Sequence, residues 1–181
     1  MSSKKFLPLL FLFLTIVSCV DDLDFDQIND YSATPEFTAA LTSFRILPFQ
    51  FFNSSGIQET ERTDITDFRI FQNSYLRDKL VKLDFNLEIK NEYNRAFILQ
   101  IDFLNSNNSI THRFQEIRIN ANTLDYKFLE EIVVSTNQNI KNTSKVRITV
   151  QLEDPLLAID PNGTEELELK SSLKFYLDTD A

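Results

Sequence analysis

The sequence is poor in the residue types on which many catalytic and cofactor sites depend. Its 181 residues include two glycines, one histidine and one cysteine, and no tryptophan. With Gly56 and Gly163 alone, the chain cannot form a Gly-rich phosphate loop, a dinucleotide fingerprint or a GxSxG nucleophile elbow. One histidine and one cysteine also leave no second His or Cys ligand for a zinc ion. We therefore expect no cofactor, no metal site and no enzymatic activity.

The remaining titratable residues leave one catalytic alternative open. His112 lies on the apolar face of an alternating segment, where a position in the core or at a barrel edge is more typical than a catalytic one. Glycoside hydrolysis needs only two carboxyl groups facing each other across about 5–10 Å. The candidate carboxylates are Glu130, Glu131, Glu165, Glu166 and Glu168. Because Glu-rich flanks of strands are usually solvated surfaces, a carboxylate-based hydrolase is the less favoured hypothesis.

Negative charge exceeds positive charge along the chain. There are 27 acidic and 18 basic residues, which gives a formal net charge of −9 at pH 7. Binding to nucleic acid depends on neutralising phosphates with lysine and arginine, so we expect no nucleic-acid partner. The same charge would repel anionic lipid headgroups, so we expect any attachment to a membrane to come through a covalent lipid.

The first residues have the pattern of a secretory signal. Lys4 and Lys5 precede a run from Phe6 to Val17 that is apolar apart from Thr15. This run is too short to cross a bilayer, since a membrane span needs about 20 apolar residues. We expect residues 1–18 to be a signal peptide.

The end of this run resembles the lipobox of bacterial lipoproteins. It reads Ile16-Val17-Ser18-Cys19 and contains the only thiol of the chain. The resemblance implies cleavage before Cys19 and acylation of that cysteine. Two acyl chains already give stable anchoring, so a triacylated Cys19 would hold the protein at a membrane. The alternative is an unmodified cysteine in an ordinary signal peptide.

An acidic segment follows the cysteine and contains Asp21, Asp22, Asp24, Asp26 and Asp30. It resembles the export signal of surface lipoproteins of the Bacteroidota, which implies an outer-membrane location with the domain facing the cell exterior. Acidic segments are also typical of a flexible, solvated tether, and both interpretations can hold together. We assign residues 19–33 to the lipidated cysteine and this tether. Residues 34–181 form the globular domain, which resembles small lipoproteins of that phylum, a resemblance that carries no activity.

Apolar and polar residues alternate with a period of two over much of this domain, which is typical of half-buried strands. In residues 81–90, one face carries Val81, Leu83, Phe85, Leu87 and Ile89. A second alternating segment, 97–104, follows the polar turn 91–94, so the sequence predicts a hairpin there. Apolar residues on both faces of this second segment indicate a central strand. A change of parity after Phe114 predicts a β-bulge near Gln115 or Glu116.

Further patterns complete the fold prediction. Residues 145–152 and 167–177 alternate, and Asp160-Pro161-Asn162-Gly163 suits a type I turn between them. Residues 37–52 predict a strand pair at a sheet edge, because Pro48 lies inside it. A strand at 124–128 and a short helix at 134–141 are also expected. Together these patterns predict an all-β domain, an antiparallel two-sheet β-sandwich of about seven strands with one or two short helices. A small closed barrel is the main alternative.

Aromatic residues supply the candidate binding sites. Phe49, Phe51 and Phe52 would form a partner-binding patch if exposed, although packing in the core is the commoner role of such residues. Because a sugar ring stacks on an aromatic face and tryptophan is absent, Tyr93, expected in a hairpin turn, is the candidate ligand-binding residue for a glycan.

Three functional hypotheses result. The first is a non-catalytic lipoprotein that acts as an accessory or binding subunit of an outer-membrane or cell-surface protein complex. The second is a surface module that binds a glycan or another ligand. The third is the carboxylate-based hydrolase.

Overall fold

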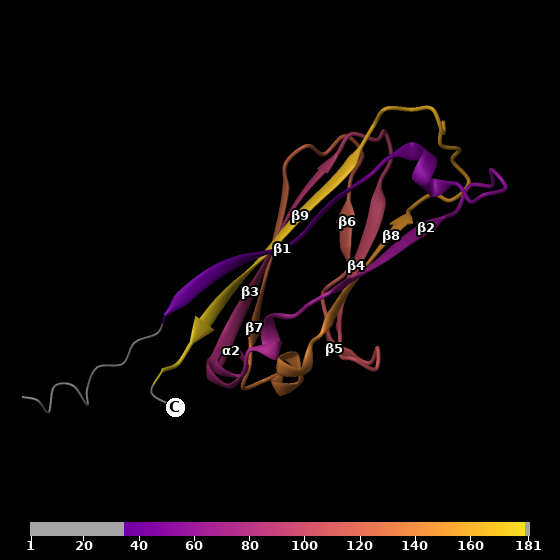
Figure 1. Cartoon of the computed structure of the whole chain (residues 1–181). Coiled ribbons are helices and arrows are strands. Elements are labelled where there is room, and N and C mark those ends of the chain that lie inside the picture. Colours follow the sequence, from indigo (N-terminus) through magenta and orange to yellow (C-terminus); the bar gives the residue numbers. More distant parts are fainter. Residues whose placement is uncertain (1–34, 180–181) are drawn as a thin grey trace, which may run out of the picture. The chain divides into compact units, whose positions relative to one another are not determined.

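The computed structural model describes residues 35–179, which form a β-sandwich of two antiparallel sheets (Figure 1). The first sheet has the order β1 (Glu36–Ile46), β9 (Leu167–Leu177), β3 (Leu80–Asn91) and β7 (Tyr126–Val133). The second has the order β2 (Glu61–Asp67), β8 (Lys145–Leu152), β4 (Phe97–Leu104) and β5 (Ile110–Arg113), and β6 (Ile117–Ile119) also pairs with β4. The predicted all-β sandwich is confirmed, with nine strands rather than about seven.

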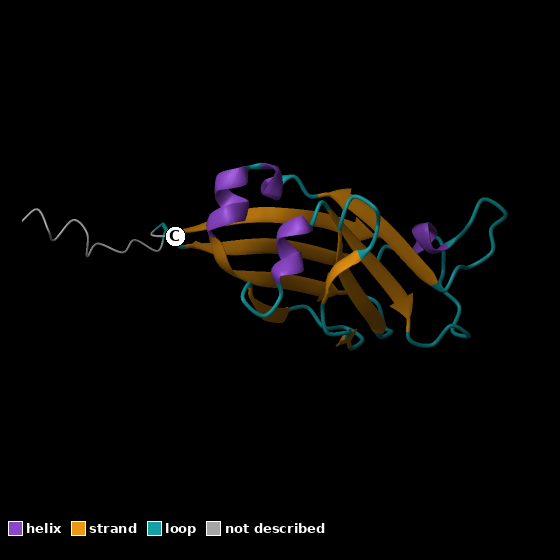
Figure 2. Cartoon of the chain, turned by 90° about the horizontal axis from the view of Figure 1, so that it is seen from below, coloured by secondary structure: helices purple, strands orange, loops and turns teal. Residues whose placement is uncertain are grey.

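Four short helical segments join the strands within residues 35–179 (Figure 2). Three are 3-10 helices: η2 (Pro48–Phe51), η3 (Ile70–Gln72) and η4 (Gln138–Asn142). The fourth is the α-helix α2 (Ser74–Lys79), and the side chain of Asn73 caps it by accepting the backbone N–H of Leu76. In the described part of the chain, no helix has the length and apolar character needed to cross a membrane.

The core forms where the predicted apolar faces of the two sheets meet. In β3, Leu83, Phe85, Leu87 and Ile89 are buried, and in β4 the buried residues are Phe97, Leu99, Ile101 and Phe103. The rings of Phe85 and Phe103 meet edge to face across the interface, with centroids 6.2 Å apart. Burial of each such aromatic side chain contributes about 1.5–3 kcal/mol. Alternation along each strand therefore identifies the core face correctly.

Val81 departs from this pattern. It is 38% exposed, whereas Leu80 is buried in its place. The pairing of β3 with β9 shifts register between Leu80 and Lys82. Because of this irregularity, the side chain of Leu80 and not that of Val81 faces the core at the start of β3. The prediction that Val81 lies on the core face is therefore wrong.

The predicted hairpin between residues 81–90 and 97–104 is also wrong. β3 pairs with β7 and β9, whereas β4 pairs with β8, β5 and β6. The turn after Asn91 therefore carries the chain from one sheet to the other. Two alternating segments joined by a polar turn fit both connections, because alternation reports the buried face and not the neighbouring strand. The prediction that 97–104 is a central strand is confirmed, since β4 has partners on both sides.

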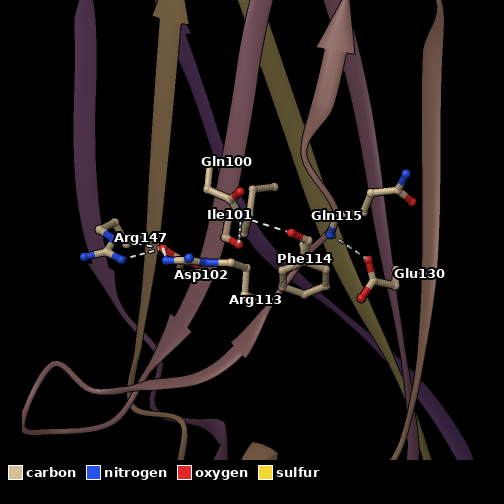
Figure 3. Close-up of polar contacts among 8 residues, drawn as sticks. All are labelled: Gln100, Ile101, Asp102, Arg113, Phe114, Gln115, Glu130 and Arg147. Carbon is tan, nitrogen blue, oxygen red and sulfur yellow. Dashed lines mark hydrogen bonds and ion pairs between the residues drawn. The ribbon is translucent and has the colours of Figure 1, made fainter.

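The predicted bulge is confirmed between β5 and β6. Phe103 pairs with His112 and Leu99 pairs with Ile117, so the segment opposite β4 contains one extra residue. Side chains satisfy the backbone groups that the bulge removes from the ladder (Figure 3). Gln100 Nε2 donates to the carbonyl oxygen of Phe114 at 3.0 Å, and the N–H of Gln115 donates to Glu130 Oε2 at 3.2 Å.

Residues 37–52 form one strand and not a strand pair. β1 covers the first part and pairs, among the described strands, only with β9, so its predicted edge position is confirmed. Pro48 then begins η2, where its fixed φ angle favours the first helical position. The expected strand at 124–128 is β7, and the expected helix at 134–141 is the later η4. The turn at Asp160 is confirmed, because Gly163 N donates to Asp160 O at 3.0 Å.

The predicted signal peptide, Cys19 and the acidic tether lie outside the described residues.

Candidate functional site: the loop end of the sandwich

The two longest connections lie together at one end of the sandwich. β1 and β9 pair along their whole lengths, from Glu36 opposite Tyr176 to Ile46 opposite Leu167. The first described residues therefore lie at one end, and residues 47–60 and 153–166 lie at the other, about 30 Å away for strands of this length (Figures 1 and 2). We call residues 47–60 and 153–166 the loop end.

Aromatic side chains form a buried platform under the loop end. Phe51 is fully buried, and its ring centroid lies 5.8 Å from that of Phe97 and 6.4 Å from that of Tyr93. Tyr93 is 4% exposed, and its hydroxyl donates to the carbonyl oxygen of Ile46 at 3.1 Å. Burial raises the pKa of Tyr93 above its ordinary range.

The burial of these rings contradicts two of the predicted binding sites. Phe51 is part of the core and cannot contact a partner, and buried Tyr93 cannot stack on a sugar ring. Phe52 is half-buried and packs against the core. Only Phe49, at 58% exposure, keeps the predicted accessibility. The expected strand alternation failed here because these residues form a 3-10 helix, in which Phe49 and Phe51 do not share a face.

Hydrogen bonds from two side chains join the loops to each other and to the sandwich. Gln58 Nε2 donates to Leu157 O at 3.2 Å, and its Oε1 accepts the N–H of Ile159 at 2.7 Å. Arg95 donates to Leu157 O at 3.0 Å and to Ala158 O at 2.8 Å. Because burial is the largest influence, the pKa of Arg95 is lowered from its ordinary value. Both loops are therefore fixed in place although they contain little regular structure.

The tip of the first loop is a tight hairpin. Phe52 and Gln58 form an isolated antiparallel bridge, and Gly56 N donates to Asn53 O at 2.9 Å. Asn53 Oδ1 accepts the N–H groups of Ser55 and Ile57. Gly56 has a φ angle of +73°, which glycine adopts without strain.

Large apolar side chains project from these fixed loops. Leu156 is 93% exposed, Ile57 is 63% exposed and Leu157 is 47% exposed. None of these three residues was predicted from the sequence to be a binding residue. The signal available for two of them is the pair Leu156-Leu157, which interrupts an otherwise acidic, turn-rich segment. Together with Phe49 they form what we call the apolar tip.

Acidic residues surround the apolar tip. Residues 153–166 contain five acidic residues and no basic residue, and residues 47–60 contain one acidic residue and no basic residue. Glu153 and Glu59 are paired with Arg118 and Arg62. Among the described residues, no ion pair within 4 Å joins Asp154, Asp160 or Glu165 to a basic side chain. A shallow recess of about 260 Å³ is lined by Leu157, Asp160 and Glu165 and also by Tyr93 and Arg95, so one guanidinium group lies beside these carboxylates.

Three of the five carboxylates considered for catalysis, Glu130, Glu166 and Glu168, have structural roles. Glu130 accepts from the N–H of Gln115, and its Oε1 lies 2.7 Å from Nε2 of His112. Nδ1 of His112 contacts the amide nitrogen of Asn137 at 3.1 Å, so this histidine bridges β5 and the segment after β7. Glu166 and Glu168 form ion pairs with arginine and lysine side chains. Within residues 35–179, no group of three or more His, Cys, Asp or Glu is placed to hold a metal ion.

A buried charge cluster stabilises the outer face of the second sheet (Figure 3). Asp102 of β4 is buried between Arg113 of β5 and Arg147 of β8. Arg113 Nε donates to Oδ1 at 2.8 Å and Arg147 Nε donates to Oδ2 at 3.2 Å. Burial opposes ionisation of Asp102, but the bonds from both arginines outweigh it and lower the pKa of the carboxyl group. The cluster therefore connects three strands, β4, β5 and β8.

Comparisons with known proteins show only distant structural likeness. No protein-family model matches the chain, and no curated protein matches it. A protein of Parabacteroides distasonis described as secreted has a TM-score of 0.48 and 12% identity, over 64% of this chain and 38% of that one. The VP2 protein of infectious bursal disease virus has a TM-score of 0.39 and 12% identity, over 82% and 33%. A Bacillus endospore appendage protein has a TM-score of 0.36 and 8% identity, over 81% and 91%.

The chain spans about a third of the length of the first two of these proteins. At this level of similarity, nothing about the fold or the activity of the chain follows from them.

Proposed function

We propose that this protein is a lipid-anchored, non-catalytic accessory or binding subunit of an outer-membrane or cell-surface protein complex. The observation that carries the proposal is the loop end, where rigid loops present the apolar tip at the end of the sandwich remote from Pro35. The chain that follows an anchored Cys19 would join the domain at Pro35.

This arrangement suits binding to another protein. Single exposed apolar residues are ordinary, but four large ones gathered on two hydrogen-bonded loops are typical of an interaction surface. Loops that are already ordered lose little conformational entropy on binding. The chemistry of the described domain also favours binding over catalysis, since Glu130 and Asp102 are engaged in structural contacts.

The anchor is tested by mass spectrometry of the protein purified from native membranes. We expect a mature chain that begins at Cys19 and carries a diacylglyceryl group and an N-acyl chain. Digestion of intact cells with an added protease should cleave the domain if it faces the exterior. A chain that starts at another residue, or that has a free thiol and washes off in buffer, would refute the anchor.

The binding role is tested by purification from detergent-solubilised membranes. The wild-type chain should recover a partner in stoichiometric amount, and the variant Ile57→Ser/Leu156→Ser should lose it. Leu129 and Val133 are also exposed apolar residues but lie on β7. The matched variant Leu129→Ser/Val133→Ser should therefore keep the partner. Recovery of the wild-type protein alone would argue against an accessory role.

A further inference from the structure

We infer that the apolar tip inserts into an apolar socket with a basic rim on a different protein, with Leu156 as the central inserted residue. The inference rests on the proposed function and adds the chemistry of the partner.

Leu156 has the properties of an anchor residue. It is the most exposed large apolar side chain among the described residues, at 93%. Its backbone N–H donates to Asp154 Oδ1 at 3.0 Å, which fixes the direction of the turn that carries it. Residues that dominate binding energy are typically apolar or aromatic groups that fill a pocket and are shielded by a surrounding ring of contacts. Ile57 and Leu157 lie on the same two loops, which Gln58 joins by a hydrogen bond.

The charge around the apolar tip indicates which residues would surround the apolar socket on the partner. Asp154, Asp160 and Glu165 form no ion pair within 4 Å among the described residues, and neither loop contains a lysine or arginine. Arg95 lies beside these carboxylates and its charge interacts with Asp154, so three negative charges stand against one positive charge. A complementary surface would carry lysine or arginine around its apolar centre, because electrostatic complementarity favours correct partners and disfavours like charge.

The same charge disfavours two other occupants. A second copy of this chain would bring an identical set of carboxylates against the first, which costs energy. An anionic lipid surface attracts basic segments, and neither loop has a basic residue.

A photo-crosslinking experiment on the full-length chain in its native membrane tests the inference. Cys19 is the only cysteine, so an introduced cysteine would be the sole free thiol of the acylated protein. Ser54 is exposed in the hairpin of the loop end, and Ser135 is exposed after β7 at the opposite end. Ser54→Cys labelled with benzophenone maleimide should give one discrete crosslink to a different protein, and Ser135→Cys should not. In the Ser54→Cys background, Leu156→Ser should lower the yield at least about tenfold.

A second set of variants tests the basic rim. Asp154→Asn, Asp160→Asn and Glu165→Gln together remove three charges, while the asparagines keep an oxygen that can accept the turn hydrogen bonds of Leu156 and Asn162. We expect about a tenfold lower yield at 50 mM salt and a weaker dependence on salt. The matched control neutralises three exposed carboxylates outside the loop end and should leave the yield unchanged: Glu88→Gln, Glu116→Gln and Asp125→Asn.

Each of the other possible outcomes would contradict a different part of the inference or of the proposed function. A crosslink to another copy of the chain, or to lipid only, overturns the inference of a different protein. A yield that falls with Leu156→Ser but not with the neutralised variant overturns the basic rim and leaves the proposed function standing. If a partner co-purifies but Ser54→Cys gives no crosslink, the loop end is not the docking surface. If no partner is found by either method, the proposed function itself fails.

Discussion

At the scale of single residues, the side chain of Tyr93 is held by ring packing and by the hydrogen bond from its hydroxyl group to Ile46 O. The polar turn around it led us to expect exposure, but the turn passes between the sheets and places the ring against Phe51 and Phe97. Sequence polarity describes the neighbours of a residue along the chain, whereas burial depends on neighbours that the fold brings in.

Tyr93→Phe should remove the donor to Ile46 O and lower the free energy of unfolding by about 1 kcal/mol at pH 7. Because burial raises the pKa of Tyr93, the folded state retains the phenol proton more strongly than the unfolded state. This contribution is complete below pH about 10, the pKa of an unfolded tyrosine, and is lost as the pH rises further. Urea denaturation from pH 7 to 11 should therefore show a smaller alkaline loss in Tyr93→Phe. Equal losses in both proteins would contradict this account.

Asp102 provides a second test at this scale. Asp102→Asn leaves Arg113 and Arg147 without their carboxylate and should lower the free energy of unfolding by about 2 kcal/mol. Less is expected than for a fully buried pair, because Arg113 is 57% exposed. The pKa of Asp102 is lowered in the folded state, so its stabilisation is present at neutral pH. It is lost as the pH falls below about 4, the unfolded value.

Denaturation of both proteins between pH 2 and 7 measures this effect, and the difference between them should shrink toward the acid end. Glu153→Gln is the matched control, because its pair with Arg118 lies on the surface, where solvent screens the charges, and should contribute little to stability. A loss as large as that of Asp102→Asn would show that burial does not distinguish the two pairs.

At the scale of elements, the connection from β3 to β4 carries the chain from the first sheet to the second. Asn91 is fully buried in this connection. Its Nδ2 donates to Arg95 O and Asn120 O, both at 2.8 Å, and its Oδ1 accepts the N–H of Tyr93. These bonds satisfy backbone N–H and carbonyl groups in the turn between the two sheets, which strand pairing does not satisfy.

Asn91→Asp should be strongly destabilising, because it replaces two donors with an oxygen facing two carbonyl oxygens. We expect a loss of about 2–4 kcal/mol in the free energy of unfolding, measured by urea denaturation at pH 7. Asn94→Asp is the control, since Asn94 makes an exposed contact with Asn122 in the same turn. Similar stability of the two variants would mean that the turn does not depend on Asn91.

At the scale of the whole molecule, the described domain contains its own core. All of its buried apolar residues lie between Ile46 and Leu177. We therefore expect a chain that begins at Thr34 to unfold with the same free energy as the mature chain, within about 0.5 kcal/mol. Denaturation of the two chains compares them directly. Lower stability of the short chain would show that residues 19–33 contribute to the stability of the domain.

The sequence by itself determined which faces of the strands are buried, the edge position of β1, the bulge before β6 and the sandwich class. These features follow from period-two alternation and from proline and turn chemistry, which act over a few residues. Only the tertiary structure decided which strands pair, that Phe51 and Tyr93 are buried, and that Ile57 and Leu156 lie at one end. Those outcomes depend on contacts between residues about a hundred positions apart, such as Gln58 with Leu157, and no local pattern contains them.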